Sequence, residues 1–169
     1  MKILKSITLA LLVSAVAAPA FAAEIKAVAT FSILGDIVAQ VGGDRVALTT
    51  IVGANADTHV YEPKPADAVA VSQADVLFVN GLGFEGWLDR FVQSTAFKGP
   101  VVVASKGVQS HAMAEDDHAE DHEHGHDHGT TDPHAWQSLS NGLLYVENVA
   151  AGLCAVDADG CAIYEANAA

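Results

Sequence analysis

The sequence predicts an α/β fold built on a parallel four-stranded sheet with flanking helices. Three observations support this prediction. Short β-rich apolar runs alternate with segments of helical periodicity, which is the pattern of parallel strands joined by crossover helices. The strands are nearly continuous apolar runs, as expected when helices cover both faces of a sheet. Hydrophobic residues make up 51% of the chain, which is enough to build one core.

The expected elements alternate regularly, from a first strand to a fourth. The strands are expected at residues 25–30, 45–52, 75–80 and 101–104, with helices between them at 33–41, 65–73 and 83–93. Ser32 is the expected N-cap of the first helix, and Gly42 follows that helix as its stop signal. Pro65 opens the second helix at its first turn. In such a fold the crossovers are right-handed, and ligands bind at the carboxyl ends of the strands.

The two ends of the chain carry distinct signals. Lys2 and Lys5, the apolar stretch 7–16 and the small residues up to Ala22 describe a secretory signal peptide over residues 1–22, cleaved after Ala22. This stretch is shorter than the roughly 20 residues that a membrane-spanning helix needs. After His134 the apolar spacing is helical, pauses at 157–160 and resumes at 161–167. We therefore expect an α/β lobe over 23–153 and, at 154–169, the start of a connection to a missing C-terminal lobe.

Export to the periplasm bears on the two cysteines, because an oxidising compartment allows disulfides to form. Cys154 and Cys161 are close enough in sequence to form a local disulfide, which is the interpretation we favour. Zinc ligation is the alternative. Their spacing is longer than the usual two to four residues, however, and the sequence holds no second cysteine pair.

The acidic net charge of the chain argues against a nucleic-acid partner. The chain has 8 basic and 21 acidic residues and a net charge of -13, so no basic stripe can neutralise a nucleic-acid backbone. Residues 111–132 instead mix acidic side chains with histidines, which are His111, His118, His122, His124, His126 and His128. Such a loop offers many interchangeable ligands without a rigid frame, which predicts weak and unselective binding of zinc, nickel or copper. A solvated acidic linker is the alternative.

Two further histidines follow strands at their carboxyl ends. His59 lies in DTHVYEPKP after the second strand, and His134 lies in DPHAW after the fourth. Two neutral imidazoles could supply half of a tetrahedral zinc site, with Zn–N bonds of about 2.0–2.1 Å. The nearest carboxylates could accept a hydrogen bond from an imidazole or hold a water; they are Asp57, Glu62 and Asp132. For either histidine alone, a helix-capping or hydrogen-bonded core role is the alternative.

Several motifs in a fixed order resemble the ZnuA-like family, the periplasmic zinc-binding proteins of ABC uptake transporters. They are the signal peptide, AVATFSILGDIVAQVGGDRV, HVYEPKPAD, ADVLFVNGLGFEGWLDRF, the His/acid loop and DPHAW. The resemblance implies a monomeric solute-binding protein, not an enzyme, that captures Zn²⁺ between two α/β lobes joined by a long helix. It also implies delivery to an inner-membrane ABC permease, and a periplasmic metal chaperone is a further candidate partner.

The resemblance assigns individual residues as well. His59 and His134 occupy the two ligand positions of the family's N-terminal lobe, whereas the ligands of the C-terminal lobe have no counterpart in this sequence. Thr58 stands where some zinc-specific relatives carry an acidic residue, so it offers no carboxylate. The fourth ligand is then a water or a side chain of the other lobe.

Three alternative functions are kept beside this one. Manganese- and iron-binding relatives share the fold, but His ligands beside a His-rich loop favour zinc over manganese, which prefers more carboxylate oxygen. A metal-buffering surface adhesin is the second alternative. A zinc-dependent hydrolase is the third, for which Glu62 is the one candidate base near His59. No HExxH, GxSxG or P-loop pattern supports it.

Overall fold

The computed structural model describes residues 24–109 and 131–169, which form an α/β lobe with a central sheet. Four parallel strands pair in the order β2-β1-β3-β4; they are β1 (Ile25–Phe31), β2 (Val46–Val52), β3 (Val76–Val79) and β4 (Val101–Val103). The predicted sheet is thus confirmed. The signal peptide and the six histidines of the His/acid loop lie outside the described residues.

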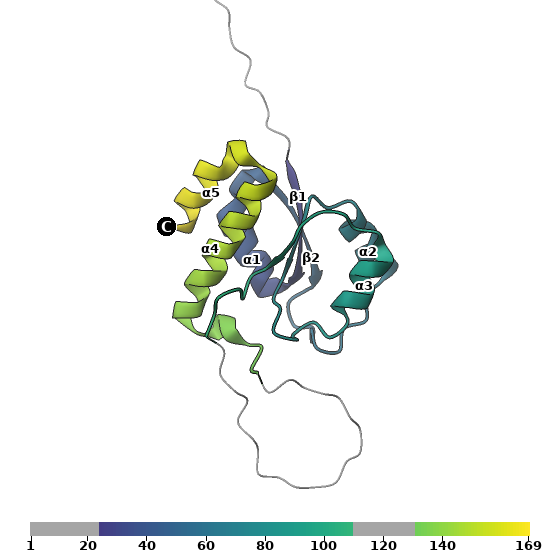
Figure 1. Ribbon diagram of the computed structural model, residues 1–169. Coiled ribbons are helices and arrows are strands. Elements are labelled where there is room, and N and C mark those ends of the chain that lie inside the picture. Colours follow the sequence, from purple (N-terminus) through teal and green to yellow (C-terminus); the bar gives the residue numbers. More distant parts are fainter. Residues whose placement is uncertain (1–23, 110–130) are drawn as a thin grey trace, which may run out of the picture.

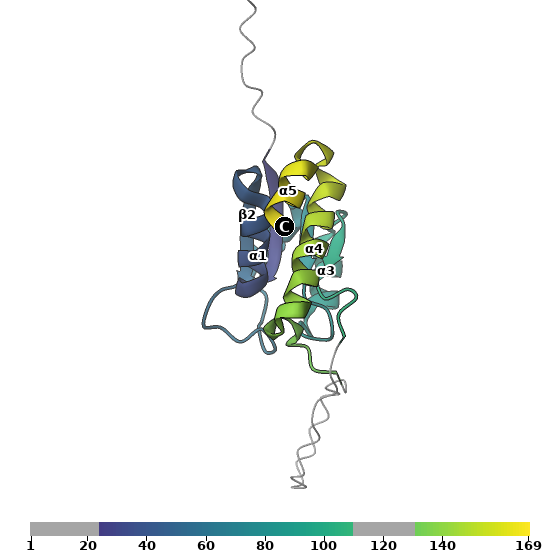
Figure 2. The same cartoon turned by 90° about the vertical axis from the view of Figure 1, so that its left-hand side faces the viewer.

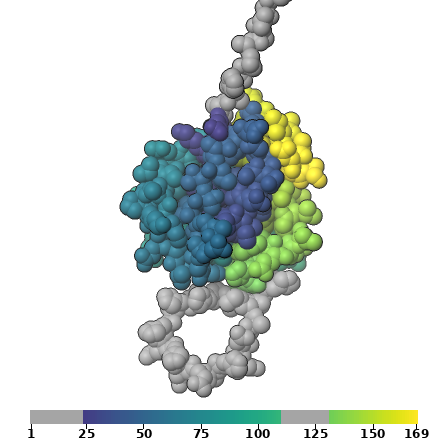
Figure 3. All heavy atoms as spheres, turned by 180° about the vertical axis from the view of Figure 1, so that it is seen from behind, coloured from purple at the N-terminus to yellow at the C-terminus, as the bar shows by residue number. Residues whose placement is uncertain are grey.

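Five helices cover both faces of the sheet (Figure 1). One layer contains α1 (Ser32–Gly42), α4 (Leu139–Val156) and α5 (Cys161–Ala168), and the other contains α2 (Pro65–Ser72) and α3 (Leu88–Thr95). Figure 2 looks onto the first layer, where α1 and α4 run along the sheet and α5 folds back beside them. In Figure 3 the green-to-yellow C-terminal helices lie directly against the purple and blue first third of the chain.

Burial follows from this layering. Every residue of β3 is buried, because helices cover both faces of this inner strand. The edge strand β4 leaves Val101 and Val103 exposed. Apart from Val71 of α2, the largest fully buried side chains come from the sheet and from the α1–α4–α5 layer; they include Phe78, Leu77, Leu34, Tyr145 and Tyr164. The main core therefore lies between the sheet and that layer.

Two details differ from the sequence prediction. Phe31, not Ser32, occupies the N-cap of α1, and no side chain caps this helix. The third helix begins at Leu88 rather than at residue 83. The residues Gly81, Leu82 and Gly83 have φ values of 82°, 56° and 76°, in the left-handed region that a right-handed helix excludes. Residues 80–87 therefore form a loop, which we call the β3–α3 loop.

Helix α4 packs as a core helix of the lobe. Among the described residues it is the one helix of sufficient length and hydropathy to cross a membrane by those criteria alone. Its inner face is buried against α1, α5 and the sheet, through Tyr145, Val149, Gly152 and Leu153. Its first half leaves Leu139 and Leu143 exposed.

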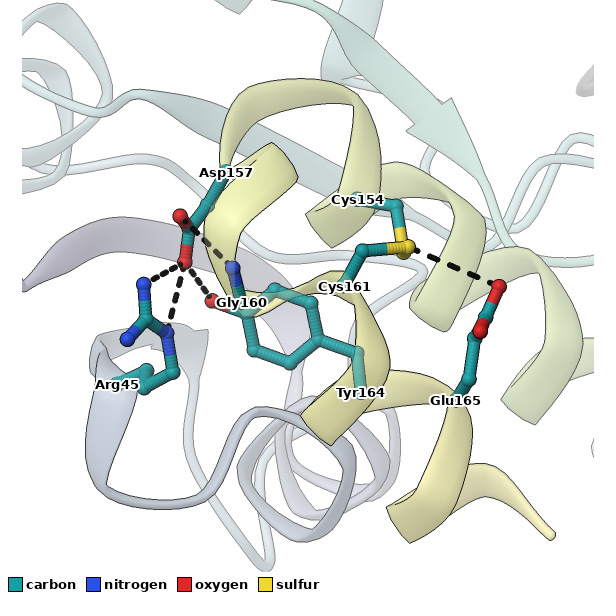
Figure 4. The surroundings of a disulfide bond; sticks show 7 residues. All are labelled: Arg45, Cys154, Asp157, Gly160, Cys161, Tyr164 and Glu165. Carbon is teal, nitrogen blue, oxygen red and sulfur yellow. Dashed lines mark hydrogen bonds and ion pairs between the residues drawn. A yellow bond between two sulfur atoms is a disulfide. The ribbon is translucent and has the colours of Figure 1, made fainter.

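The predicted disulfide joins Cys154 near the end of α4 to Cys161 at the start of α5 (Figure 4). A polar cluster holds the same corner from the other side. Asp157 accepts hydrogen bonds from Arg45 Nη2 at 2.6 Å and from the Tyr164 hydroxyl. The hydrogen bond from Tyr164, which has the largest effect, and the hydrogen bond from Arg45 lower the pKa of Asp157. Because the cysteines are bonded to each other, their sulfurs are not free thiolates that could bind zinc.

Candidate metal centre

The loop after β2 presents His59 at the carboxyl edge of the sheet. Two hydrogen bonds fix the backbone around it. The Asp57 carboxylate accepts from the His59 backbone N–H at 2.9 Å. The carbonyl of Thr58 accepts from the indole Nε1 of Trp87, also at 2.9 Å. Thr58 and Trp87 are buried, whereas His59 is exposed, so a buried anchor holds an accessible imidazole.

The segment that precedes α4 presents His134 at the same edge. Asp132 Oδ1 accepts from the His134 backbone N–H at 2.9 Å and contacts Nδ1 of the imidazole at 2.8 Å. Because an ionised carboxylate only accepts hydrogen bonds, we assign the ring proton to Nδ1, which leaves Nε2 with its lone pair. The carbonyl of Pro133 accepts from the buried Asn80 side chain at 2.9 Å. In this tautomer Asp132 would orient the imidazole so that its Nε2 could accept a metal ion.

The two imidazoles meet although 75 positions separate them in sequence. Their Nε2 atoms lie 3.2 Å apart. If both bound one zinc ion at about 2.0–2.1 Å, this separation would correspond to an N–Zn–N angle of roughly 100–105°, near the tetrahedral value. With 37% of its side chain exposed, His134 leaves room for further ligands on the solvent side. The pair therefore has the geometry of half a metal site.

The aromatic side chain of Phe84 packs against both imidazole rings. The Phe84 ring lies 4.8 Å from the His59 ring and 5.6 Å from the His134 ring, centroid to centroid, with edge-on geometry. Phe84 in turn packs on Phe31 at 5.0 Å and on Trp136 at 4.8 Å. These edge-on contacts restrict the tilt of both imidazoles.

A buried polar network lies beneath this aromatic layer, and the sequence analysis did not identify it. Glu85 Oε1 accepts from the Thr30 hydroxyl and from the Asn80 backbone N–H, both at 2.6 Å, and Oε2 accepts from the Gly81 N–H at 3.2 Å. Burial raises the pKa of Glu85, and these hydrogen bonds oppose that shift. The Tyr145 hydroxyl of α4 donates to Asn80 Oδ1. A polar Asn directly after an apolar strand is the one feature of the sequence that points to this network, and nothing in the sequence marks Glu85 as buried.

The other predicted site residues have different positions. The Asp57 carboxylate is exposed and holds the His59 backbone rather than an imidazole. Glu62 is exposed, and within residues 24–109 and 131–169 it makes no hydrogen bond to either histidine. The His/acid loop departs after Gln109 and returns at Thr131, so its ends border the described part of the chain near His134.

Comparison with known proteins identifies relatives that bind metals. The manganese-binding lipoprotein MntA of Halalkalibacterium halodurans is 41% identical over 144 residues, which cover 85% of this chain and 44% of the relative. The manganese ABC transporter substrate-binding lipoprotein PsaA of Streptococcus pneumoniae is 36% identical over 152 residues, covering 86% and 46%. The chain thus spans about half the length of the curated relatives it matches.

Solved structures show the same fold. The Mn-bound periplasmic metal binding protein from Candidatus Liberibacter asiaticus superimposes with a TM-score of 0.73 at 32% identity, over 86% of this chain and 50% of that one. Zn(II)-bound AdcA from Streptococcus pneumoniae has a TM-score of 0.70 at 23% identity, over 86% and 29%, and supports the fold alone.

A family model described as ZnuA, the periplasmic component A of the zinc-uptake complex, matches residues 27–169. Members of this family are substrate-binding proteins of transporters, not enzymes, which argues against a zinc-dependent hydrolase. The chain belongs to the ZnuA family of metal-binding proteins of ABC transporters.

Proposed function

We propose that this chain is the metal-capturing N-terminal lobe of a solute-binding protein that serves an ABC importer, and that its cargo is Zn²⁺. The observation that carries the proposal is the 3.2 Å approach of the Nε2 atoms of His59 and His134. Two imidazoles, one fixed by a carboxylate at Nδ1, suit a borderline-soft cation such as zinc. The six histidines in residues 111–128 suit zinc as well, as a weaker collecting loop.

Manganese is the second candidate cargo, and the relatives favour it. The two curated relatives described above, at 41% and 36% identity, are both named for manganese. Manganese requires more oxygen ligands than zinc does. Within this chain Oδ1 of Asp132 is engaged by the backbone N–H and Nδ1 of His134, so we do not expect this oxygen among the ligands of a manganese ion.

The proposed location is the periplasm, reached through a signal peptide cleaved after Ala22. The relatives named above are called lipoproteins. The proposed partner is the permease of the importer, because a binding protein passes its cargo to the membrane component.

Calorimetric titration of the chain with Zn²⁺ and with Mn²⁺ tests the proposal. We expect one tighter zinc site, which His59→Ala or His134→Ala weakens strongly, and a weaker zinc class, which deletion of residues 111–129 removes. The deletion is the matched control, since it takes away histidines without touching the pair. If the deletion abolished the tighter site while His59→Ala left it intact, the pair would not be the metal site. Tighter binding of Mn²⁺ than of Zn²⁺ would reassign the cargo.

A further inference from the structure

Both candidate ligands are anchored in the same way to the same segment. The peptide carbonyl that immediately precedes each histidine accepts a hydrogen bond from a side chain of the β3–α3 loop. Trp87 Nε1 donates to the carbonyl of Thr58, and Asn80 Nδ2 donates to the carbonyl of Pro133, each at 2.9 Å. These two donors stand at the opposite ends of residues 80–87. One loop after β3 therefore holds the backbones of two loops that follow β2 and β4.

The anchor positions suit control of the imidazoles. A carbonyl directly before a histidine shares a rigid peptide plane with that residue's nitrogen, so fixing the oxygen restricts where the side chain starts. Metal–ligand distances tolerate errors of only about 0.2 Å. The two histidines lie on loops that follow different strands, so both loops must be held by one rigid segment to meet that tolerance. The β3–α3 loop is such a segment, because it donates a hydrogen bond to each of them. Phe84, from the middle of this loop, contacts both imidazole rings as well.

The loop is itself rigidly held. Asn80 is fully buried and Trp87 is 8% exposed. Glu85 accepts hydrogen bonds from the backbone of Asn80 and Gly81 at the start of the loop and from Thr30 of β1, so the loop is tied to the central strands. A buried network in which every member has a partner favours one arrangement over others. No described side-chain polar atom that is buried lacks a partner.

We propose that the β3–α3 loop is the positioning element of the metal site, with Asn80 and Trp87 as positioning residues that set the separation of the two Nε2 atoms. Trp87 acts through His59 and Asn80 acts through His134; neither touches the ion. This inference rests on the proposed function. It adds that metal affinity depends on residues that offer no ligand atom.

Two variants remove one anchor each. Trp87→Phe keeps an aromatic ring in the core and deletes the Nε1–H donor, and Asn80→Ala deletes the Nδ2 donor. We expect each to weaken Zn²⁺ binding 10- to 100-fold, the range typical of residues that orient ligands. Val38→Ala is the control, because Val38 is a fully buried core residue of α1 outside the site and its truncation lowers stability alone. Zinc affinity should be unchanged in this control at temperatures where it is folded.

A spectroscopic readout separates positioning from stability. Co²⁺ bound by the wild-type chain should show visible d–d bands that depend on ligand geometry, and Trp87→Phe should change their intensity or position at saturating Co²⁺ while Val38→Ala should not. If the wild-type affinity and spectrum persisted in Trp87→Phe, which conserves the fold, the inference would be overturned. His59→Ala and His134→Ala distinguish the two levels. If neither weakened binding, the proposed function would fail; if both did but the loop variants did not, the positioning role alone would fail.

Discussion

Two glycines of α4 differ in their surroundings, and this contrast makes a quantitative stability prediction. A Cβ built at Gly152 would lie 2.8 Å from Val102 Cγ2 and 2.9 Å from Phe78 Cε1, closer than real side chains approach. A Cβ at Gly142 would have nothing within 4 Å. Helix α4 therefore approaches the sheet most closely at Gly152, and the absent side chain permits this approach.

Alanine at each position separates the steric effect from helix propensity. Replacing Gly by Ala inside a helix stabilises it by roughly 0.5–1 kcal/mol, and this gain applies to both variants. Gly152→Ala also overpacks the core at Phe78, at a cost of about 1–3 kcal/mol. We thus expect Gly142→Ala to be more stable than the wild type, and Gly152→Ala to lie about 1–3 kcal/mol below Gly142→Ala.

Urea unfolding followed by far-ultraviolet circular dichroism measures this difference directly. A thermal scan should show the two midpoints separated by about 2–4 °C for each kcal/mol in a chain of this size. Equal stabilisation by both variants would refute the reasoning, because it would mean that α4 does not contact the sheet closely at Gly152. A large drop in the slope of the unfolding curve would indicate a changed unfolded state instead.

Three further predictions concern the site and the C-terminal corner. Asp132→Ala should weaken zinc binding about 10-fold or more in a titration, because His134 loses the acceptor at its Nδ1; unchanged affinity would argue against this tautomer. Reducing the disulfide, which closes a loop of about eight residues, should lower the free energy of unfolding by about 2.5 kcal/mol without unfolding the chain, as urea curves with and without dithiothreitol would show. The pKa of Asp157 is lower in the folded state than in the unfolded state, so its stabilising contribution is present at neutral pH and is lost as the pH falls from about 4 through the folded value. Urea midpoints at pH 7 and pH 3 should therefore differ less in Asp157→Asn than in the wild type, and an identical difference would contradict the assignment.

The sheet was predictable because its signal is strong and local. Each strand is a short apolar run between turn residues, and the structure places all four within a few residues of the prediction. The apolar spacing of Trp87, Leu88 and Phe91 predicts a helix that begins at residue 83, earlier than α3 begins. Leu88 and Phe91 do lie in α3, whereas the residues before them form a loop whose backbone adopts left-handed φ values at residues 81–83. Hydrophobic spacing alone carries no information about such a backbone.

The convergence of His59 and His134 was predictable because parallel strands bring their carboxyl ends to one edge. The family resemblance pointed to the same pair, whose Nε2 atoms lie 3.2 Å apart. The supporting residues were not predictable in the same way. Asn80 and Trp87 act on backbone carbonyls of distant loops, and such contacts leave no spacing pattern in the sequence. Glu85 could not be distinguished from an exposed acid until the fold showed its burial.

The buried polar network of Thr30, Asn80 and Glu85 requires a physical reason. Apolar side chains in its place would avoid the desolvation that raises the pKa of Glu85. Apolar side chains at positions 80 and 87 would leave the carbonyls before both histidines without their donors. The loops that carry His59 and His134 could then adopt several positions relative to the sheet, because apolar contacts have little directionality. Hydrogen bonds do have direction, and a network with all partners present has one low-energy arrangement. The two histidines thus owe their common geometry to buried groups that offer no ligand atom. We therefore expect metal affinity to depend on the β3–α3 loop as well as on the ligands.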